Sequence, residues 1–424
     1  MMPGDHQIQS DISIIGAGPA GLLASLWLTK YNTAHILVDS NTFPRQKPCG
    51  DVITSNVIRY LNEIDPGIIS GMIKKGILMP IKGSTLFTPN NKSFGLLYRG
   101  LDGNADIPSC YSMERAAFDN YLMELVRLSP LATVINGYHV NAISRLGDEY
   151  QLRAANGQMI RTRLVIGASG SNSTISKILG SLIKEDRHMA VGIRGYFRGI
   201  QCEDNIAELI LDKSFFPGGI YLVPLPDGQY NVNLVIRKDI LLRKKNGLRQ
   251  YFDQMLEQNI LLKDKFINSI QVGEFEGHTL FLGTKKRRLS GQGYMLAGDA
   301  GGLINLITGN GIPQAMISGK LAALKALACL DKNDFSAGFM CTYDRDLYKV
   351  IKTDLSLGKM INPFLSIKIF QKIAIFFLNI LASKKKQDSA MIELFYRKNP
   401  VYSIFNPFFY YKLFFKKKAS RIPL

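Results

Sequence analysis

The chain has 424 residues, of which 46% are hydrophobic and 20% are charged, so it predicts a globular protein with a large core rather than a disordered one. Its net charge of +18 predicts an acidic partner, such as an anionic membrane, a phosphorylated substrate or nucleic acid. The five cysteines are scattered and form no CxxC pair, which argues against a disulfide framework or a zinc site.

The amino-terminal part predicts a strand over 11–15, a helix over 18–30 and a second strand over 34–39. The first strand and the helix are joined by a GxGxxG turn, a pattern that binds a dinucleotide pyrophosphate through backbone N–H groups. Gly16 permits the tight turn, Gly18 lets the pyrophosphate approach, and Gly21 lets the helix pack closely on the strand. The candidate binding residues of this turn are Gly16, Ala17, Gly18, Pro19, Ala20 and Gly21.

Asp39 ends the second predicted strand and is followed by Ser40, a further candidate binding residue. A carboxylate at this place accepts hydrogen bonds from ribose hydroxyls and disfavours a 2′-phosphate. The unit therefore indicates FAD or NAD rather than NADP. An ordinary structural turn is the alternative interpretation of the glycines alone.

The middle of the chain changes character twice. Residues 43–56 are rich in proline, glycine and basic residues, residues 113–128 predict a helix, and the apolar strand 164–166 leads into a second glycine-containing turn. Between about 190 and 281, alternating patterns predict a second, sheet-based unit with one helix near 248–258, in which Val232, Leu234 and Ile236 share one face of a strand.

Residues 293–330 return to a strand, a glycine turn and a long helix. The carboxylate at the strand end and the glycine-rich helix start resemble the GDA motif and the following helix start of FAD-dependent enzymes, and this resemblance favours FAD. It agrees with physical chemistry, because a helix amino terminus stabilises the negative charge of a reduced flavin. An Asp capping an ordinary turn is the alternative. The candidate binding residues here are Gly298, Asp299, Gly309, Asn310, Gly311 and Ile312.

Four segments resemble the geranylgeranyl reductase family of FAD-dependent oxidoreductases, within a fold shared by aromatic hydroxylases and flavin-dependent halogenases. Residues 43–50 resemble its K-x-C-G segment, 114–119 its RxxFD helix, 217–224 its PGGYGWxFP strand, and 298–300 its GDA motif. The resemblance implies that Arg45, Cys49 and Gly50 lie beside the flavin, that Arg115 approaches the cofactor, and that Tyr221 lines the substrate cavity. Members of the family reduce isolated double bonds of prenyl chains with flavin hydride.

The expected function is therefore an FAD-dependent oxidoreductase that reduces C=C bonds of an isoprenoid or other lipid-like substrate, with NAD(P)H as a transient donor. The alternative is an FAD-dependent monooxygenase acting on an aromatic or polyene substrate. Ser169 stands where related hydroxylases have an acidic DG motif, which weighs against a hydroxylase without excluding it. The halogenase WxWxIP motif is absent, since Trp27 is the only tryptophan, which argues against a halogenase.

Cys49 and Tyr221 are the candidate catalytic residues. Cys49 shapes the flavin face, delivers a proton or is a small inert hydrophobe, and these alternatives stay open. Tyr221 is either an acid or a wall of the cavity. The substrate strand lacks the family's tryptophan, which leaves Tyr221 as its only ring. The five histidines show no ligand spacing, so no metal is expected.

The predicted fold is α/β, α+β mixed. Residues 1–185 and 285–335 are expected to form a discontinuous Rossmann-like FAD-binding domain, into which 186–284 insert a β-sheet substrate-binding domain. Residues 336–424 are expected to form a helical, basic and aromatic membrane-proximal region.

In that region residues 362–382 predict an apolar helix, and Lys368, Lys372, Asn379 and Ser383 fall towards one side of it. Lysine and aromatic clusters follow at 384–386 and 408–418. Such a segment lies in an anionic membrane interface or packs as a closing helix on the core. The sequence contains no uninterrupted run of about 18 apolar residues, which argues against a membrane span. With no signal-type amino terminus, we expect a cytoplasmic protein, peripheral at the cytoplasmic membrane face. No nucleic acid is expected, and the oligomeric state is left open.

Overall fold

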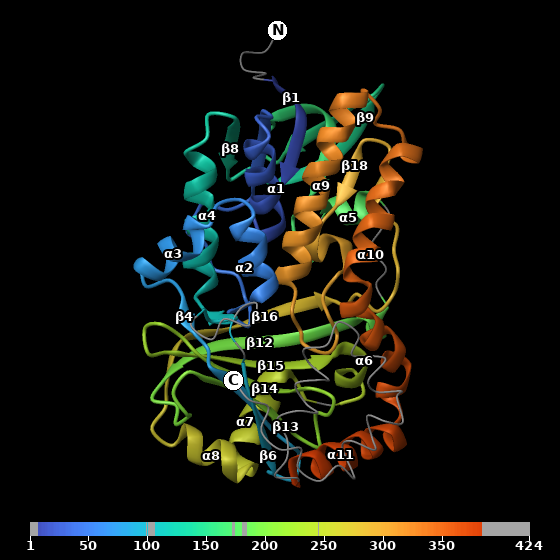
Figure 1. Ribbon diagram of the computed structural model, residues 1–424. Helices are drawn as coiled ribbons and strands as arrows, with labels where there is room; N and C mark the ends of the chain where they lie inside the picture. Colours follow the sequence, from blue (N-terminus) through green and yellow to red (C-terminus); the bar gives the residue numbers. More distant parts are fainter. Residues whose placement is uncertain are drawn as a thin grey trace, which may run out of the picture.

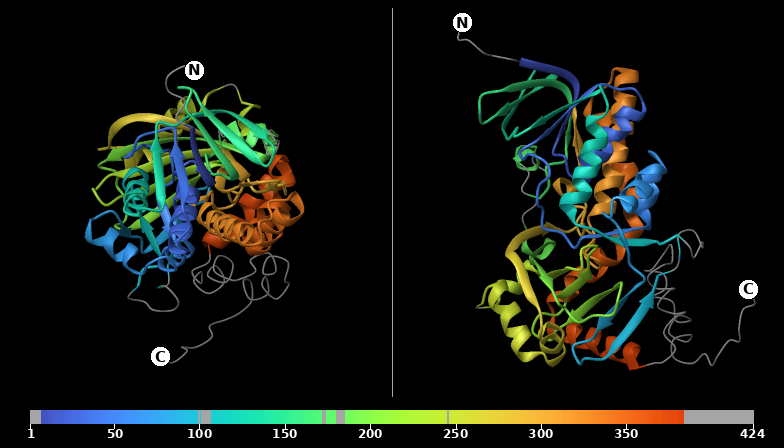
Figure 2. Two further views of the ribbon diagram at one scale, coloured as in Figure 1. Left: turned by 90° about the horizontal axis from the view of Figure 1, so that it is seen from above. Right: turned by 90° about the vertical axis from the view of Figure 1, so that its left-hand side faces the viewer.

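The computed structural model describes residues 7–98, 100, 107–171, 174–179, 185–244 and 246–383. Figure 1 shows two stacked lobes, each built around one sheet, and Figure 2 shows the same division from the side. Parallel and antiparallel sheets occur together with helices, so the predicted mixed α/β class is confirmed.

The upper lobe contains an eight-stranded sheet with the path β17-β18-β11-β1-β2-β8, and β10 and β9 extend it from β11. The strands β8, β2, β1, β11 and β18 run parallel, so their carboxyl ends meet at one edge of the sheet. The bounds are β1 Gln7–Ile15, β2 His35–Asp39, β8 Ala132–Asn136, β9 Val140–Leu146, β10 Glu149–Ala154, β11 Met159–Gly167, β17 Ser290–Gly291 and β18 Tyr294–Leu296.

Helices from both ends of the described chain cover this sheet (Figure 1). The bounds are α1 Pro19–Lys30, α2 Ser55–Asn62, α3 Gly67–Lys74, α4 Arg115–Arg127, α5 Thr174–Ile178, α9 Ile312–Lys332 and α10 Ala337–Ile361. The largest apolar core joins these helices to the sheet, with fully buried Ile12 and Ile14 of β1, Leu22 of α1 and Met316 of α9.

The lower lobe contains a seven-stranded sheet with the order β16-β12-β15-β14-β13-β5-β6. The bounds are β5 Gly83–Phe87, β6 Ser93–Leu97, β12 Met189–Arg198, β13 Ile206–Leu211, β14 Gly219–Pro224, β15 Tyr230–Arg237 and β16 Ile270–Phe281. Val232, Leu234 and Ile236 point to a core closed by α7 Leu248–Gln258 and α8 Ile260–Phe266. The short helix α6 Lys238–Leu241 follows β15. The opposite face of the sheet is turned towards the upper lobe.

Two connections join the lobes. A small sheet of β3 Val52–Thr54, β7 Cys110–Ser112 and β4 Met79–Pro80 precedes β5 and follows β6 along the chain. The 3₁₀ helix η2 Asp186–His188 lies where the chain leaves the upper lobe for β12, and residues 282–289 lead back from β16 to β17, ahead of the 3₁₀ helix η3 Gly298–Gly301. Residues 83–97 thus pair with the lower sheet although the sequence places them within 1–185, and the proposed domain boundaries stay a prediction.

The carboxyl-terminal helices descend from the upper lobe to the bottom of the lower one (Figure 1). After α10 the chain forms the 3₁₀ helix η4 Asn362–Ser366 and then α11 Lys368–Ser383. None of the described helices combines the length and apolarity that crossing a bilayer requires. The predicted lysine and aromatic clusters at 384–386 and 408–418 lie outside the described residues.

The contact between α1 and α9 depends on a glycine. A Cβ atom at Gly319 would lie 2.1 Å from the carbonyl oxygen of Ala20. We predict that Gly319→Ala lowers the free energy of unfolding by about 1–3 kcal/mol, because the two helices have to separate. Gly338→Ala is the matched control, since its Cβ would meet only Ser336 Oγ at 4.0 Å. Denaturant unfolding of both variants measures the effect, and equal midpoints would contradict this account of the helix contact.

Candidate functional site

The first glycine turn has the shape that its sequence predicts. Gly16 has a φ of 102°, and a Cβ atom there would lie 2.5 Å from the carbonyl oxygen of Ala168. At Gly18 the space is open, because the nearest described atom to an added Cβ would be a guanidinium nitrogen of Arg45 at 3.8 Å. No side chain in the described part of the molecule caps the amino terminus of α1. Its free N–H groups therefore face open space and fit a bound pyrophosphate.

Asp39 lies at the end of β2, beside this turn. The backbone N–H of Ala17 donates to Asp39 Oδ2 at 2.8 Å, and the backbone N–H of Asn41 donates to Oδ1 at 2.9 Å. The side chain is buried and its orientation is fixed by the turn itself. Both carboxylate oxygens retain lone pairs that could accept from ribose hydroxyls, and the binding role of Asp39 stays a prediction. Ser40 is exposed next to it.

A buried chain of charges runs from this carboxylate towards α4. Arg45 Nε lies 3.8 Å from Asp39 Oδ1, and Arg45 Nη1 lies 3.5 Å from Asp119 Oδ2. Arg115 donates to both oxygens of Asp119, at 3.1 and 2.7 Å. Burial opposes the charge of Arg115, but the neighbouring Asp119 raises the pKa of the guanidinium above its usual value. Asp119 thus holds the cations Arg45 and Arg115 beside the first glycine turn.

The second glycine turn, at residues 298–302, lies next to the first because the helices that follow the two turns, α1 and α9, pack on each other. A Cβ atom at Gly298 would lie 3.2 Å from Ala315 and 3.3 Å from Ala20. Asp299 is partly exposed, and Lys47 Nζ lies 3.6 Å from its Oδ2. The segment Gly309, Asn310, Gly311 then leads to the start of α9 at Ile312. The amino termini of α1 and α9, which are far apart in the sequence, therefore open onto one space.

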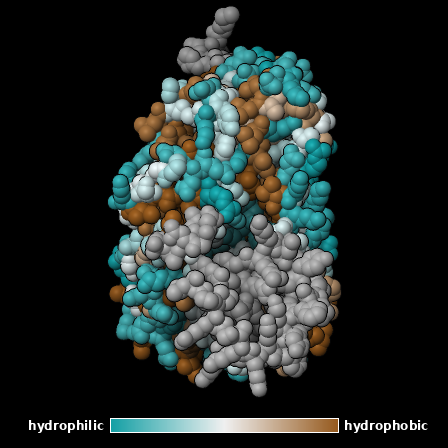
Figure 3. All heavy atoms as spheres, in the orientation of Figure 1, coloured by the Kyte–Doolittle hydropathy of each residue, from teal (hydrophilic) through white to brown (hydrophobic). Residues whose placement is uncertain are grey.

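That space is a cavity of about 950 Å³ between the lobes. Figure 3 shows the molecular face hollowed near its middle, where the lobes meet. The predicted site residues that line the cavity are Gly18, Pro19, Ala20, Cys49, Gly50, Arg115, Tyr221, Gly298, Asp299, Gly309, Asn310, Gly311 and Ile312. The remaining ones, which are not among the residues that line the cavity, are Gly16, Ala17, Gly21, Asp39, Ser40 and Arg45.

Cys49 and Tyr221 lie in the wall of the cavity, on different elements. Burial raises the pKa of the Cys49 thiol and the pKa of Tyr221, so both groups are protonated at neutral pH. The carbonyl oxygen of Cys49 accepts a hydrogen bond of 2.8 Å from Asn231 Nδ2. This bond ties the Cys49 segment to the lower sheet.

Several polar residues of the same wall were not selected from the sequence, namely Lys47, Asp51, Asn233, Arg237 and His278. Asn231 and Asn233 alternate with the apolar residues of β15, so their side chains point to the face opposite the core. Burial lowers the pKa of His278 to about 4, which makes it neutral at physiological pH. The sequence did contain one signal for this wall, because asparagines at alternate positions of an otherwise apolar strand indicate a second, polar face.

The far part of the cavity is mainly apolar, although Ser84 and Thr85 of β5 and Glu208 of β13 also line it. Leu86, Phe94 and Leu96 from β5 and β6 and Leu209 and Leu211 from β13 line it, together with Ala374, Phe377 and Leu378 of α11. The last three positions lie on one face of α11 because they are three and four residues apart. The carboxyl-terminal helix is therefore a wall of the cavity.

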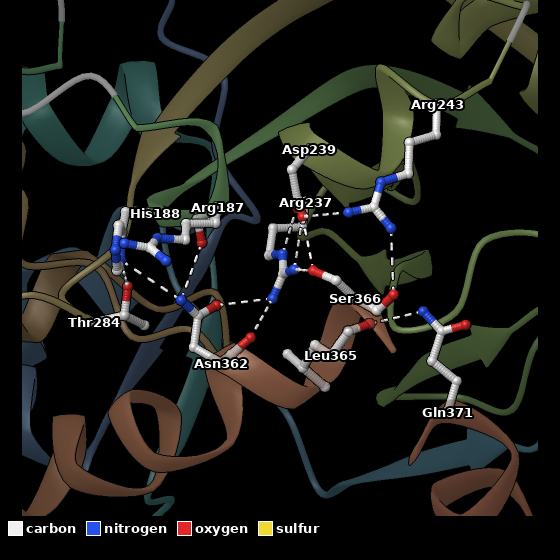
Figure 4. A network of polar contacts seen from close by, with 10 residues as sticks. All are labelled: Arg187, His188, Arg237, Asp239, Arg243, Thr284, Asn362, Leu365, Ser366 and Gln371. Carbon is white, nitrogen blue, oxygen red and sulfur yellow. Dashed lines mark hydrogen bonds and ion pairs between the residues drawn. The ribbon is translucent and has the colours of Figure 1, made fainter. Parts of the chain in front are cut away.

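Polar contacts hold the chain to the lower lobe just before α11 and near its end, and Figure 4 shows the first of these two sets. Buried Arg237 donates from Nη1 to the carbonyl oxygen of Asn362 at 2.6 Å and to its Oδ1 at 2.9 Å, and from Nε to Asp239 at 2.5 Å. Near the end of α11, Thr88 Oγ1 donates to Asn379 Oδ1 at 2.6 Å. The predicted polar side of this helix is thus partly used for attachment.

Comparison with known proteins gives the site a chemical context. A family model described as FAD binding domain matches residues 9–352. A menaquinone reductase of Mycobacterium tuberculosis (strain CDC 1551 / Oshkosh) is 25% identical over 74% of this chain and 76% of its own length. A digeranylgeranylglycerophospholipid reductase of Methanocaldococcus jannaschii is 26% identical over 79% of this chain and 81% of its own.

Among solved structures, a geranylgeranyl bacteriochlorophyll reductase-like protein from Thermoplasma acidophilum superposes with a TM-score of 0.75 at 20% identity, covering 89% of this chain and 92% of that one. This likeness shows a shared fold. The predicted resemblance and the predicted class of FAD-dependent oxidoreductase are confirmed by these comparisons.

The predicted contribution of Asp39 to FAD binding is directly testable. We predict that Asp39→Ala weakens FAD binding by about 10- to 100-fold, because the change removes charged hydrogen bonds of about 1.5–3 kcal/mol. The matched control is Asp65→Ala, because Asp65 also accepts from a nearby backbone N–H, that of Gly67 at 2.7 Å, but lies on the surface. FAD fluorescence titration of the apoproteins measures both affinities. Equal losses in the two variants would contradict a specific role.

Proposed function

Because this chain belongs to the FAD binding domain family and is an FAD-dependent oxidoreductase, we propose that it reduces C=C bonds of an isoprenoid or similar lipid. When bound, reduced FAD supplies the hydride. The observation that carries the proposal is the cavity that runs from the two glycine turns to an apolar wall of β5, β6, β13 and α11. Such a wall excludes water and binds hydrocarbon by burying its surface.

The residues divide between the two ligands in this proposal. Gly18, Pro19 and Ala20 face the pyrophosphate, Asp39 the ribose, and residues 309–312 the flavin ring, with Arg45 and Arg115 as nearby cations. Cys49 and Gly50 contact the flavin face, and Tyr221 contacts the substrate. NAD(P)H is the proposed transient electron donor. The names of the relatives, which denote reductases of menaquinone and of a geranylgeranyl phospholipid, support a lipid-like substrate.

The test is an anaerobic oxidation of the reduced enzyme. FAD-loaded protein is reduced with NADPH, NADH or dithionite and mixed with a detergent-dispersed prenyl lipid, while flavin absorbance is followed. We predict that the lipid reoxidises the flavin without oxygen. Reoxidation only after oxygen is admitted, with a hydroxylated product, would favour the alternative monooxygenase, and a protein that takes up no FAD would contradict both.

A cavity variant makes this test specific. Ala374 is half-buried in α11 and lines the apolar part of the cavity. Ala374→Trp is expected to slow oxidation by long prenyl lipids at least about tenfold through steric overlap, without changing reduction by dithionite. Ala142→Trp, on the exposed strand β9, is the matched control.

We further propose that α11 rests on an anionic membrane. Its outer face exposes apolar side chains, with Ile369 at 58% and Phe376 at 62%, and Lys368 and Lys372 supply positive charge. The sequence 368–383 contains no acidic residue, and three lysines follow it at 384–386. Each basic residue near anionic lipid contributes about 1 kcal/mol. A lipid substrate would then enter beside the helix that forms the apolar wall.

We predict that Phe376→Asp weakens binding to vesicles of anionic lipid by about tenfold or more, since burial of a phenylalanine contributes about 1.5–3 kcal/mol. The control is Leu128→Asp, because Leu128 is 80% exposed at the end of α4 in the other lobe. Vesicle sedimentation at low and high salt measures the binding. The membrane proposal fails if both variants sediment like the wild type.

A further inference from the structure

Asp51 is a buried carboxyl group in the cavity wall, two residues after Cys49. Its backbone has a φ of 56°, in the left-handed region that few residues other than glycine adopt. The backbone N–H of Met113 donates to the carbonyl oxygen of Asp51 at 3.0 Å, which holds this conformation. Strained backbone of this kind concentrates at functional sites.

The two carboxyl oxygens of Asp51 have different surroundings. Tyr196 Oη donates to Oδ2 at 2.9 Å, and Asn231 Nδ2, which also bonds the carbonyl of Cys49, donates to the same oxygen. Among the residues that the structure describes, no group donates to or accepts from Oδ1, although this atom is buried. One oxygen is therefore held by two donors, and the other is left to carry a proton.

We propose that Asp51 is the catalytic acid that delivers the proton to the substrate double bond, an inference that rests on the proposed function. In this step the O–H bond of Asp51 breaks and the π electron pair of the alkene forms a C–H bond to that proton. The hydride from reduced flavin brings its own electron pair to the other carbon. The alkene gains two hydrogens and is reduced, FAD is left oxidised, and Asp51 is left as a carboxylate that water reprotonates.

The surroundings of Asp51 suit both protonation states. Burial raises its pKa to about 7, against the attraction of Arg194 and the hydrogen bonds from Tyr196 and Asn231. The acid is thus available at neutral pH, and the carboxylate formed in the step keeps both donors. Burial also raises the pKa of Tyr196, so the phenol stays a donor throughout.

The charged and titratable groups around Asp51 come from three directions. Arg194 and Tyr196 belong to β12, Arg115 belongs to α4, and Cys49 lies on its own segment. Arg194 is itself paired with Glu276 at 2.7 Å, and Glu114 lies near it. Because burial raises the pKa of Cys49 and Tyr221 from values that are already higher, Asp51 is the strongest of these acids that line the cavity.

The first arm of the test follows oxidation of the dithionite-reduced, FAD-loaded enzyme by a detergent-dispersed prenyl lipid without oxygen. Asp51→Asn is expected to slow this oxidation at least about 100-fold, the usual range for loss of a general acid, while FAD content and dithionite reduction stay normal. The wild-type rate is expected to fall as pH rises above about 7, where the acid is lost. Asp51→Glu should restore a pH-dependent rate. The control is Glu276→Gln, which removes the ion-pair partner of Arg194 but leaves Asp51, and its rate should fall above about pH 7 as in the wild type.

The second arm needs no turnover. Between the unfolded pKa of 3.8 and the folded pKa of about 7, the folded protein holds a proton on Asp51 that the unfolded chain has lost. This contribution to stability therefore falls as pH rises through that window. The melting temperature of FAD-loaded Asp51→Asn, relative to wild type, is expected to increase from about pH 5 to about pH 8.

The outcomes separate the two proposals. If lipid oxidises the wild type and Asp51→Asn at equal rates, the proton-transfer proposal is overturned while the reductase function stands. If lipid does not oxidise even the wild type, the reductase function fails and the proton transfer that rests on it fails too. A pH-independent difference in melting temperature would also overturn the proposal, because Asp51 would then carry no proton near neutral pH.

Discussion

The close packing of α1 against α9 is the constraint on which the rest of the site depends. Gly319 lets the backbone of α9 approach the carbonyl oxygen of Ala20, and Gly298 fits its turn between Ala20 and Ala315. The two glycine turns, almost 300 residues apart in the sequence, therefore open onto the same cavity. The helix amino termini supply unpaired N–H groups and positive dipole ends there, which suits a dinucleotide whose ring becomes negative on reduction.

The lower sheet positions the Cys49 segment and the carboxyl-terminal helix around the cavity. Its core-facing residues, such as Leu234, pack on α7 and α8, whereas Asn231 and Asn233 on the opposite face reach the Cys49 carbonyl and fix the segment beside the cofactor space. The same sheet holds the carboxyl-terminal helix through Arg237, which bridges Asp239 and Asn362 (Figure 4). The cavity thus has a polar end made mainly by the upper lobe and an apolar end closed by α11. This gradient suits the proposed function, in which a flavin and a hydrocarbon substrate share the cavity.

The local elements that carry the cofactor motifs were predictable because their signals lie within a few residues. The strand, turn and helix around Gly16 and Gly18 match the structure, and so do the Asp299 turn and the helix 248–258. Pairing of residues 83–97 with the lower sheet was not predictable, because it depends on contacts with β13 more than 100 residues away. Asp51 was missed for a related reason: its donors Tyr196 and Asn231 come from strands that only the fold brings together. Propensity and spacing carry no information about such partners.

The central claim is that the flavin and a lipid double bond react in one cavity. The most direct test is the mass of the lipid product. A prenyl lipid is incubated with the FAD-loaded enzyme and an electron donor, first without oxygen and then with it, and the product is examined by mass spectrometry. We predict a lipid that has gained two hydrogens per reduced double bond, in the absence of oxygen. A product that forms only with oxygen and contains an added oxygen atom would contradict this claim.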